Sequence, residues 1–173
     1  MSLAADAPAA MESDRYPYPT RPAVTAVMKG NRKTDTRPEV ALRSALHRSG
    51  ARFRKNHNVK VDEGRAIRVD IVFPRAKLAV LVDGCFWHRC PEHGVDPRSN
   101  TAYWSPKLMR NVERDRVTDL RLRVGGWTVL RVWEHEVTPS KMARTVEAVQ
   151  GSLARRGPGF LNRESRSMTA GQV

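Results

Sequence analysis

The chain has 173 residues, and its 31 lysines and arginines outnumber 18 acidic residues to give a formal net charge of +13. This length predicts one domain with a substantial core, and the apolar runs are too short for a membrane-spanning helix, which needs about 20 residues. A positive surplus of this size favours a polyanionic ligand, most often nucleic acid. The N-terminus lacks the apolar stretch of a secretory signal, so we expect a cytoplasmic protein that is nucleoid-associated when bound to DNA.

The two ends of the chain differ in composition from its middle. Residues 1–26 are rich in alanine and proline and predict a disordered basic arm, and residues 155–173 predict a flexible tail. Residues 27–154 then form the folded domain.

The first half of that domain is predicted to contain a helix and three strands. Thr36-Arg37-Pro38-Glu39 is a capping box that opens a helix ending at Ser49-Gly50. Strand-like runs follow at residues 51–57, 67–73 and 77–83, and the short turn at 74–76 predicts a hairpin between the last two.

The second half begins with an irregular segment, residues 84–103. Ser105-Pro106 is the predicted start of a charged helix that ends at Gly125-Gly126, and Thr138-Pro139 is predicted to cap a last helix running to about Leu153. Between the two helices lies a strand, residues 127–133. The order α-β-β-β-α-β-α predicts an α/β fold with a mixed sheet flanked by helices, in which a helical crossover places the fourth strand beside the third.

Both cysteines of the chain fall in the irregular segment, each with a histidine three residues later. Cys90 and His93 have a spacing that lets a tight turn direct both side chains at one ion, and Cys85 lies five residues before Cys90. His135, just after the last strand, is the best candidate for a fourth ligand. We predict a structural Zn²⁺ site of Cys85, Cys90, His93 and His135 that stabilises the loop. The alternative is two buried thiols with surface histidines.

Two aspartates at the predicted hairpin suggest a second metal. Asp70 lies in the middle of an apolar strand and Asp83 ends the partner strand, so their carboxylates could hold Mg²⁺ together. His88 could then activate the attacking water. The alternatives are a buried ion pair of Asp70 with Arg68 or Arg43, and His88 as a further zinc ligand or a surface residue.

Several segments, in one unbroken order over about residues 28–137, resemble the very short patch repair (Vsr-type) mismatch endonucleases. The segments are Thr36–Arg43, Asp70–Pro74, Gly84–His88, Asn100–Trp104, Asn111–Asp115 and Gly126–Leu130. The resemblance implies a restriction-endonuclease-like (PD-(D/E)XK-type) core that nicks one strand of double-stranded DNA 5′ to the T of a T·G mismatch, using Mg²⁺. Such mismatches arise from deamination of 5-methylcytosine.

The resemblance also implies roles for individual residues. Asp70 and the main-chain carbonyl of Val82 would hold Mg²⁺, Asn111 would reach it through water, and Glu39 would support the site. His88 would be the general base. Phe86, Trp87 and Trp104 would wedge into the base stack beside the mismatch, which fits the low cost of unstacking a mismatch; core packing is the alternative for these rings. The enzyme would act as a monomer, with accessory repair proteins as possible partners.

The chain departs from the family pattern at two places. Asp83 stands where the best-known pattern has a histidine before Gly-Cys-Phe-Trp, and the zinc ligands differ from the family's histidine-rich run. Asp83 in place of histidine motivates a second hypothesis, a restriction-like nuclease acting on other mismatched or modified duplexes. The positive charge and the aromatic wedges leave a third open, a zinc-stabilised DNA-binding module that does not cut.

Overall fold

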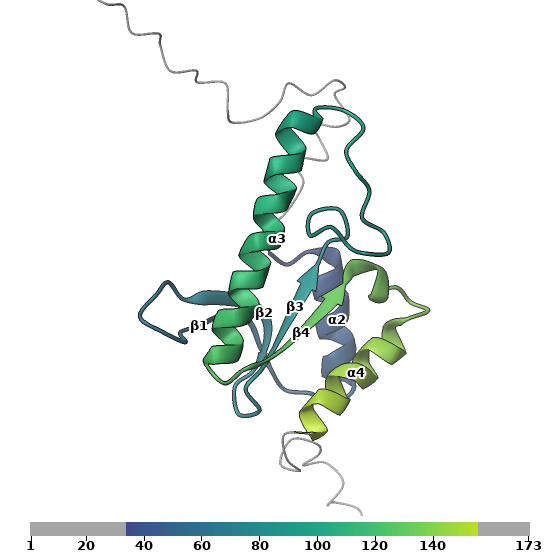
Figure 1. Ribbon diagram of the computed structural model, residues 1–173. Coiled ribbons are helices and arrows are strands. Elements are labelled where there is room, and N and C mark those ends of the chain that lie inside the picture. Colours follow the sequence, from purple (N-terminus) through teal and green to yellow (C-terminus); the bar gives the residue numbers. More distant parts are fainter. Residues whose placement is uncertain (1–33, 156–173) are drawn as a thin grey trace, which may run out of the picture.

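The computed structural model describes residues 34–155, so the predicted N-terminal arm and the tail beyond Arg155 lie outside the described residues. The elements follow the chain in this order: α2 (Arg37–Arg48), β1 (Arg54–Val59), β2 (Ile67–Phe73), β3 (Leu78–Asp83), α3 (Thr101–Val124), β4 (Thr128–Trp133), a short 3-10 helix η1 (Glu134–Glu136) and α4 (Met142–Ala154) (Figure 1). None of the helices within this range combines the length and apolarity needed to cross a bilayer.

One mixed sheet with strand order β1-β2-β3-β4 forms the centre of the fold. β1 and β2 pair antiparallel, as do β2 and β3, whereas β4 lies parallel to β3. The parallel pairing confirms the predicted helical crossover. Because parallel strands end at the same edge, β3 delivers Asp83 to the position where β4 delivers Trp133.

Helices cover both faces of the sheet (Figure 1). On one face α2 and α4 pack against β2, β3 and β4 around fully buried residues that include Leu42, Ile71, Val80 and Val149. On the other face Leu122 of α3 packs against Val69, Val72 and Ala79. β2 and β3 are therefore apolar on both sides, as expected for strands buried between helices.

The boundaries of three elements differ from the prediction. α3 begins at Thr101, so Ser105-Pro106 lies inside the helix and does not open it. Trp104 is only 7% exposed in this added first turn, and its packing outweighs the main-chain hydrogen bond that Pro106 cannot make. α4 begins at Met142, because the carbonyl of Thr138 accepts hydrogen bonds from Lys141 and Met142 in a preceding turn. β1 is shifted to residues 54–59.

The predicted N-cap residue of α2, Thr36, is confirmed, whereas Glu39 accepts the main-chain N–H of Asp35 where a capping box would use that of Thr36. The Thr36 side chain accepts a hydrogen bond from the Glu39 main-chain N–H, and Glu39 Oε1 accepts one from the Thr36 hydroxyl at 2.9 Å. Gly50, with φ +85°, follows the helix in the left-handed conformation typical of a helix end. This cap fixes Glu39 in the first turn of α2, close enough for its charge to act on Asp70.

Candidate active site and metal cluster

Asp70 lies where the β2–β3 ladder opens. The regular pairing of the two strands reaches Ile71 and Val80, and beyond it the Asp70 carboxylate accepts a hydrogen bond from the Val82 main-chain N–H at 2.8 Å. Burial, together with the negative charges of Glu39 and Asp83, raises the pKa of Asp70 to about 6. The positive charge of Arg68 and the Val82 hydrogen bond oppose this rise without cancelling it.

Glu39 is buried on α2, at 4% exposure. Its Oε2 accepts a hydrogen bond from the main-chain N–H of Asp35 at 3.0 Å and lies 4.0 Å from Arg43 Nη1. Arg43 also forms an ion pair with Asp35. The guanidinium that the sequence offered as a partner for Asp70 thus contacts Asp35 and Glu39 instead.

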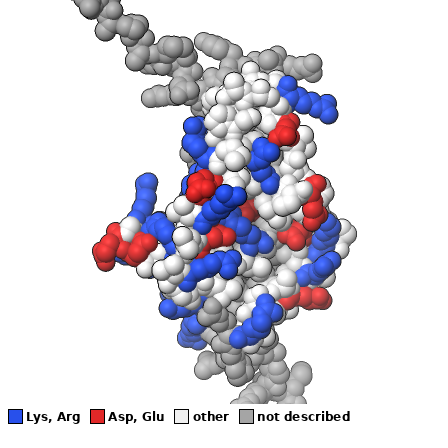
Figure 2. Space-filling model, in the orientation of Figure 1, with Lys and Arg blue, Asp and Glu red and all other residues white. Residues whose placement is uncertain are grey.

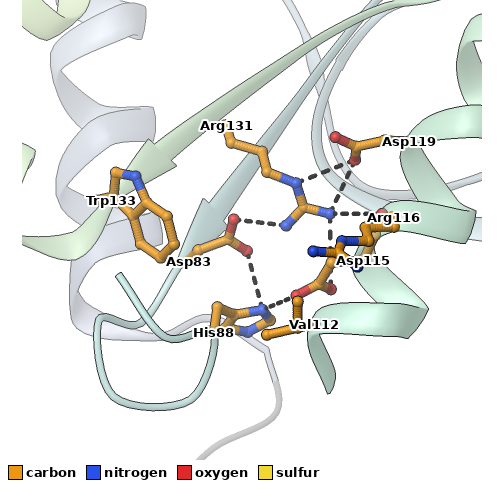
Figure 3. A pocket seen from close by; sticks show the side chains of 8 residues that line it. All are labelled: Asp83, His88, Val112, Asp115, Arg116, Asp119, Arg131 and Trp133. Carbon is orange, nitrogen blue, oxygen red and sulfur yellow. Dashed lines mark hydrogen bonds and ion pairs between the residues drawn. The ribbon is translucent and has the colours of Figure 1, made fainter. Parts of the chain in front are cut away.

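His88 lies in a pocket between the end of β3, β4 and α3 (Figure 3). Its Nδ1 is 2.6 Å from Asp115 Oδ2 on α3 and 3.5 Å from Asp83 Oδ1. Burial disfavours the charged imidazole, but the hydrogen bond to Asp115 and the charges of Asp83 and Asp115 outweigh it, so the pKa of His88 is raised. Asp83 is 4% exposed, and burial raises its pKa against the opposing charges of His88 and Arg131.

The four predicted zinc ligands come together in one cluster. The ligand atoms of Cys85, Cys90, His93 and His135 all lie within 4.8 Å of one another. His135 Nδ1 is 3.2 Å from Cys85 Sγ and 3.7 Å from Cys90 Sγ, close to the roughly 3.5 Å that separates sulfur and nitrogen ligands on a tetrahedral zinc. The other ring nitrogen, Nε2, is 3.5 Å from Glu92 Oε2, an arrangement that orients metal-binding histidines in many proteins.

The parallel β3–β4 pair explains why this cluster forms. Gly84-Cys85 follows β3 and η1 follows β4, so Cys85 and His135 leave neighbouring strand ends. The Cys85 main-chain N–H donates to Glu134 Oε1 at 2.7 Å, which ties the two connections together. Burial raises the pKa of the Cys85 thiol to about 11.

Three aromatic residues form a second cluster on the same loop and the first turn of α3. Phe86 and Trp87 have ring centroids 5.1 Å apart, and Trp104 lies 6.1 and 5.8 Å from them, all in edge-to-face arrangements. Phe86 and Trp87 are partly exposed, whereas Trp104 is buried beneath them. Asn111 donates a hydrogen bond from Nδ2 to the Trp87 carbonyl at 3.1 Å and so fastens this loop to α3.

The described surface is rich in basic side chains. Figure 2 shows lysine and arginine spread over the face in view, with acidic side chains among them. This distribution suits contact with a phosphate backbone by a folded surface.

Sequence comparisons decide the family. The family model described as DNA mismatch endonuclease Vsr matches residues 14–92. The type II nicking enzyme V.NaeI of Lentzea aerocolonigenes is 47% identical over 148 residues, which cover 86% of this chain and 89% of that protein. The chain belongs to the Vsr family. The DNA mismatch endonuclease Vsr of Escherichia coli strain K12 is 38% identical over 102 residues, 58% of this chain and 62% of that protein. Among solved structures, the catalytic domain of homing endonuclease I-Bth0305I aligns with 72% of this chain and all of that domain, at a TM-score of 0.48 and 19% identity.

Membership of the Vsr family makes the chain a DNA endonuclease, as the motifs predicted. The structure brings Asp70 beside Val82, and Glu39 close enough for its charge to act on Asp70. It places His88 beside Asp83, in a pocket on the α3 side.

Sequence reasoning missed the residues that surround His88 in this Vsr-family chain. Asp115 falls in one of the segments that resemble the family, and its spacing of four residues from Asn111 places both on one face of a helix, which is the signal that could have found it. Arg131 and Asp119 also line the pocket. For Arg131 the single available signal was a charge in the middle of a strand of apolar and β-branched residues.

Proposed function

We propose that this Vsr-family endonuclease nicks one strand of DNA 5′ to the T of a T·G mismatch left by deamination of 5-methylcytosine, and that it requires Mg²⁺. The observation that carries the proposal is the opened β2–β3 ladder, which holds the Asp70 carboxylate against Val82 within reach of the charge of Glu39.

The residues around Asp70 fit a hard divalent cation. Asp70 Oδ2 accepts the Val82 N–H. Burial first, and then the charges of Glu39 and Asp83, raise the pKa of this carboxyl, and a bound cation would favour its charged form. Asp70 and the Val82 carbonyl are the proposed ligands, with Glu39 supporting them and Asn111 acting through water. When bound, Mg²⁺ would neutralise the scissile phosphate and stabilise the departing 3′ oxygen.

His88 is the proposed general base. Its Nδ1 faces Asp115, so an Nδ1–H donated to that carboxylate leaves the Nε2 lone pair to accept a proton from water. Asp83 was predicted as a further metal ligand, but its Oδ2 is paired with Arg131 and its Oδ1 faces His88. We therefore place Asp83 on the histidine side of the site.

Phe86 and Trp87 are the proposed wedge beside the mismatch. Both rings are partly exposed on a loop, and Trp104 supports them from below. Rings held rigid in this way can unstack a base step, and a T·G pair resists unstacking less than a Watson–Crick pair does.

The Cys85–Cys90–His93–His135 cluster is the proposed Zn²⁺ site. Two thiolates and two imidazoles are the ligand set of many structural zinc sites. Zinc there would fix the loop that carries both His88 and the wedge, and in this way it would contribute to activity without taking part in the reaction.

The test uses a duplex labelled on both strands, with one T·G pair and scanned flanking bases. The proposed function predicts one nick 5′ to the T with Mg²⁺, no nick when Mg²⁺ is left out, and no nick in the T·A control. Asp70→Asn should bind the duplex without nicking it, while Asp96→Asn, an exposed matched change, should nick normally.

Because Asp83 replaces the family's histidine, other mismatches and modified pairs belong in the same experiment. Equal cutting of all duplexes would favour a restriction-like nuclease, and tight binding without cutting would favour a DNA-binding module.

A further inference from the structure

Arg131 lies at the centre of the acidic side chains that surround His88. It belongs to β4, where it stands opposite Leu81 in the parallel register with β3. Its side chain enters the pocket lined by Asp83 and Asp115, and Figure 3 shows the guanidinium between Asp83 and Asp119.

The Arg131 guanidinium contacts three aspartates from two elements. Nη1 donates to Asp83 Oδ2 at 2.6 Å, while Nε and Nη2 donate to Asp119 Oδ1 at 3.0 and 2.9 Å. Nη2 also donates to the Asp115 main-chain carbonyl at 3.2 Å and lies 3.6 Å from Asp115 Oδ1. The planar fork of arginine can make these contacts at once, whereas a lysine ammonium cannot.

Two of these aspartates also contact His88. Asp115 Oδ2 is 2.6 Å and Asp83 Oδ1 is 3.5 Å from His88 Nδ1. Each aspartate therefore offers one side to the imidazole and another to Arg131. The position of the histidine ring depends on carboxylates that Arg131 holds.

The negative charge of buried Asp83 needs a cation beside it. Asp83 is 4% exposed, and a buried carboxylate without a partner is strongly destabilising. Asp83 adds negative charge beside two further aspartates on α3, Asp115 and Asp119, in the same pocket. Arg131 supplies the compensating charge from the neighbouring strand.

We propose that Arg131 is a positioning residue that pairs with Asp83 and, through Asp83 and Asp115, orients His88 toward the attacking water. The proposal rests on the proposed role of His88 as general base. Arg131 does not contact the reacting atoms in this scheme. It affects the nicking rate because it holds the two aspartates that hold His88.

A purely structural role is the competing explanation, since Arg131 also joins β4 to α3. Arg121 provides a matched control, because it forms a similar multidentate contact elsewhere on α3. It donates to both carboxylate oxygens of Asp62, at 2.8 and 2.6 Å, and to the Arg65 carbonyl at 2.8 Å. A structural role predicts that Arg131→Lys and Arg121→Lys affect melting temperature alone.

The first measurement is single-turnover nicking with separate determination of the DNA Kd. Arg131→Lys should lower the rate by roughly 10- to 100-fold, part of the 10²–10⁴ range typical of a general base, with the Kd changed less than about threefold. Arg121→Lys should keep the wild-type rate. A loss that appears only in the Kd would make Arg131 a phosphate contact and overturn the proposal, as would an unchanged rate.

The second measurement tests the pair. Asp83→Asn and Arg131→Met should each slow nicking, and the double variant should be faster than the product of the two effects predicts. Strict independence of the two effects would overturn the pairing.

The third measurement does not depend on nicking. ¹H–¹⁵N correlation at alkaline pH, with the signal assigned by His88→Gln, should show His88 protonated at Nδ1 in the wild type and as a tautomer mixture in Arg131→Lys. The same single tautomer in both proteins would overturn the proposal. If the wild-type protein nicks none of the duplexes, the proposed function fails, and this measurement still decides whether Arg131 orients His88.

Discussion

Cys85 and His135 are 50 positions apart in the chain, yet Cys85 Sγ lies 3.2 Å from His135 Nδ1. The parallel register of β3 and β4 creates this contact, since the two residues follow adjacent strand ends. Any ion held there would join the loop of residues 84–100 to the sheet. The loop carries His88 as well as Phe86 and Trp87, so its order bears directly on the site.

Loss of a cluster ligand should therefore release zinc and lower stability. Cys90→Ser and His93→Gln are each expected to reduce bound zinc to well below one equivalent and to lower the melting temperature sharply, because metal binding to a preformed site contributes free energy of folding. Elemental analysis and thermal denaturation measure the two effects. His47→Gln, an exposed histidine on α2, is the matched control and should retain full metal content. Unchanged zinc in Cys90→Ser would show that Cys90 is not a ligand.

The Asp115–His88 contact predicts a rate effect without a binding effect. His88→Gln should slow nicking by about 10²–10⁴, the usual contribution of a general base. Asp115→Asn should also slow it, because an amide can donate to Nδ1 and so favour the wrong tautomer. Single-turnover kinetics at saturating enzyme isolate the rate from DNA affinity. Glu113→Gln lies on the exposed side of the same helix and should behave as wild type. Full activity in His88→Gln would remove it as the base.

The sequence was sufficient for the pairing of β2 with β3, for the pairing of β3 with β4 and for the zinc-type cluster, for local reasons. The capping box, the glycines at helix ends and the apolar strands are short-range signals, and the crossover rule then placed β4 beside β3. Once β4 pairs with β3, His135 just after β4 is expected to lie near Cys85 just after β3.

The start of α3 and the surroundings of His88 could not be obtained in this way. Pro106 signalled a helix start, but the burial of Trp104 against Phe86 and Trp87 extended the helix by five residues. The contacts of Arg131 depend on how α3 crosses the sheet, because its partners come from β3 and α3. Such tertiary contacts have no local pattern in the sequence.

The aromatic cluster predicts a specific effect on the mismatched base step. Trp87→Ala and Phe86→Ala should weaken binding to a T·G duplex by about 1–3 kcal/mol each, the usual worth of an aromatic–base stack, and should affect T·A duplex binding less. Fluorescence of 2-aminopurine next to the mismatch reports unstacking directly. The wild-type protein should increase it and the variants should not. An equal loss on T·G and T·A duplexes would assign the rings to core packing.

Removal of the charge of Asp70 is expected to stabilise the folded protein by an amount that depends on pH. Burial raises its pKa from the ordinary value of 3.8 to about 6 in the folded protein, so the folded state binds this proton more tightly than the unfolded state does. The free energy of unfolding therefore falls as pH rises from about 4 to 6, because the unfolded chain loses this proton first. Above that range the loss of stability has reached its full size. Asp70→Asn keeps an oxygen that can accept the Val82 N–H and removes the charge.

Without Mg²⁺ at pH 7.5, Asp70→Asn should be more stable than the wild type by about 2 kcal/mol, since each pKa unit corresponds to about 1.4 kcal/mol and partial solvation reduces the effect. The difference should shrink at pH 5, because the folded wild type is then largely protonated at Asp70. Added Mg²⁺ should stabilise the wild type and leave the variant unchanged. Denaturation at the two pH values, with zinc retained, measures all three effects. A variant less stable than the wild type at both pH values would mean that Asp70 is already compensated in the folded protein, and that the β2–β3 opening does not hold the unneutralised charge that a metal site requires.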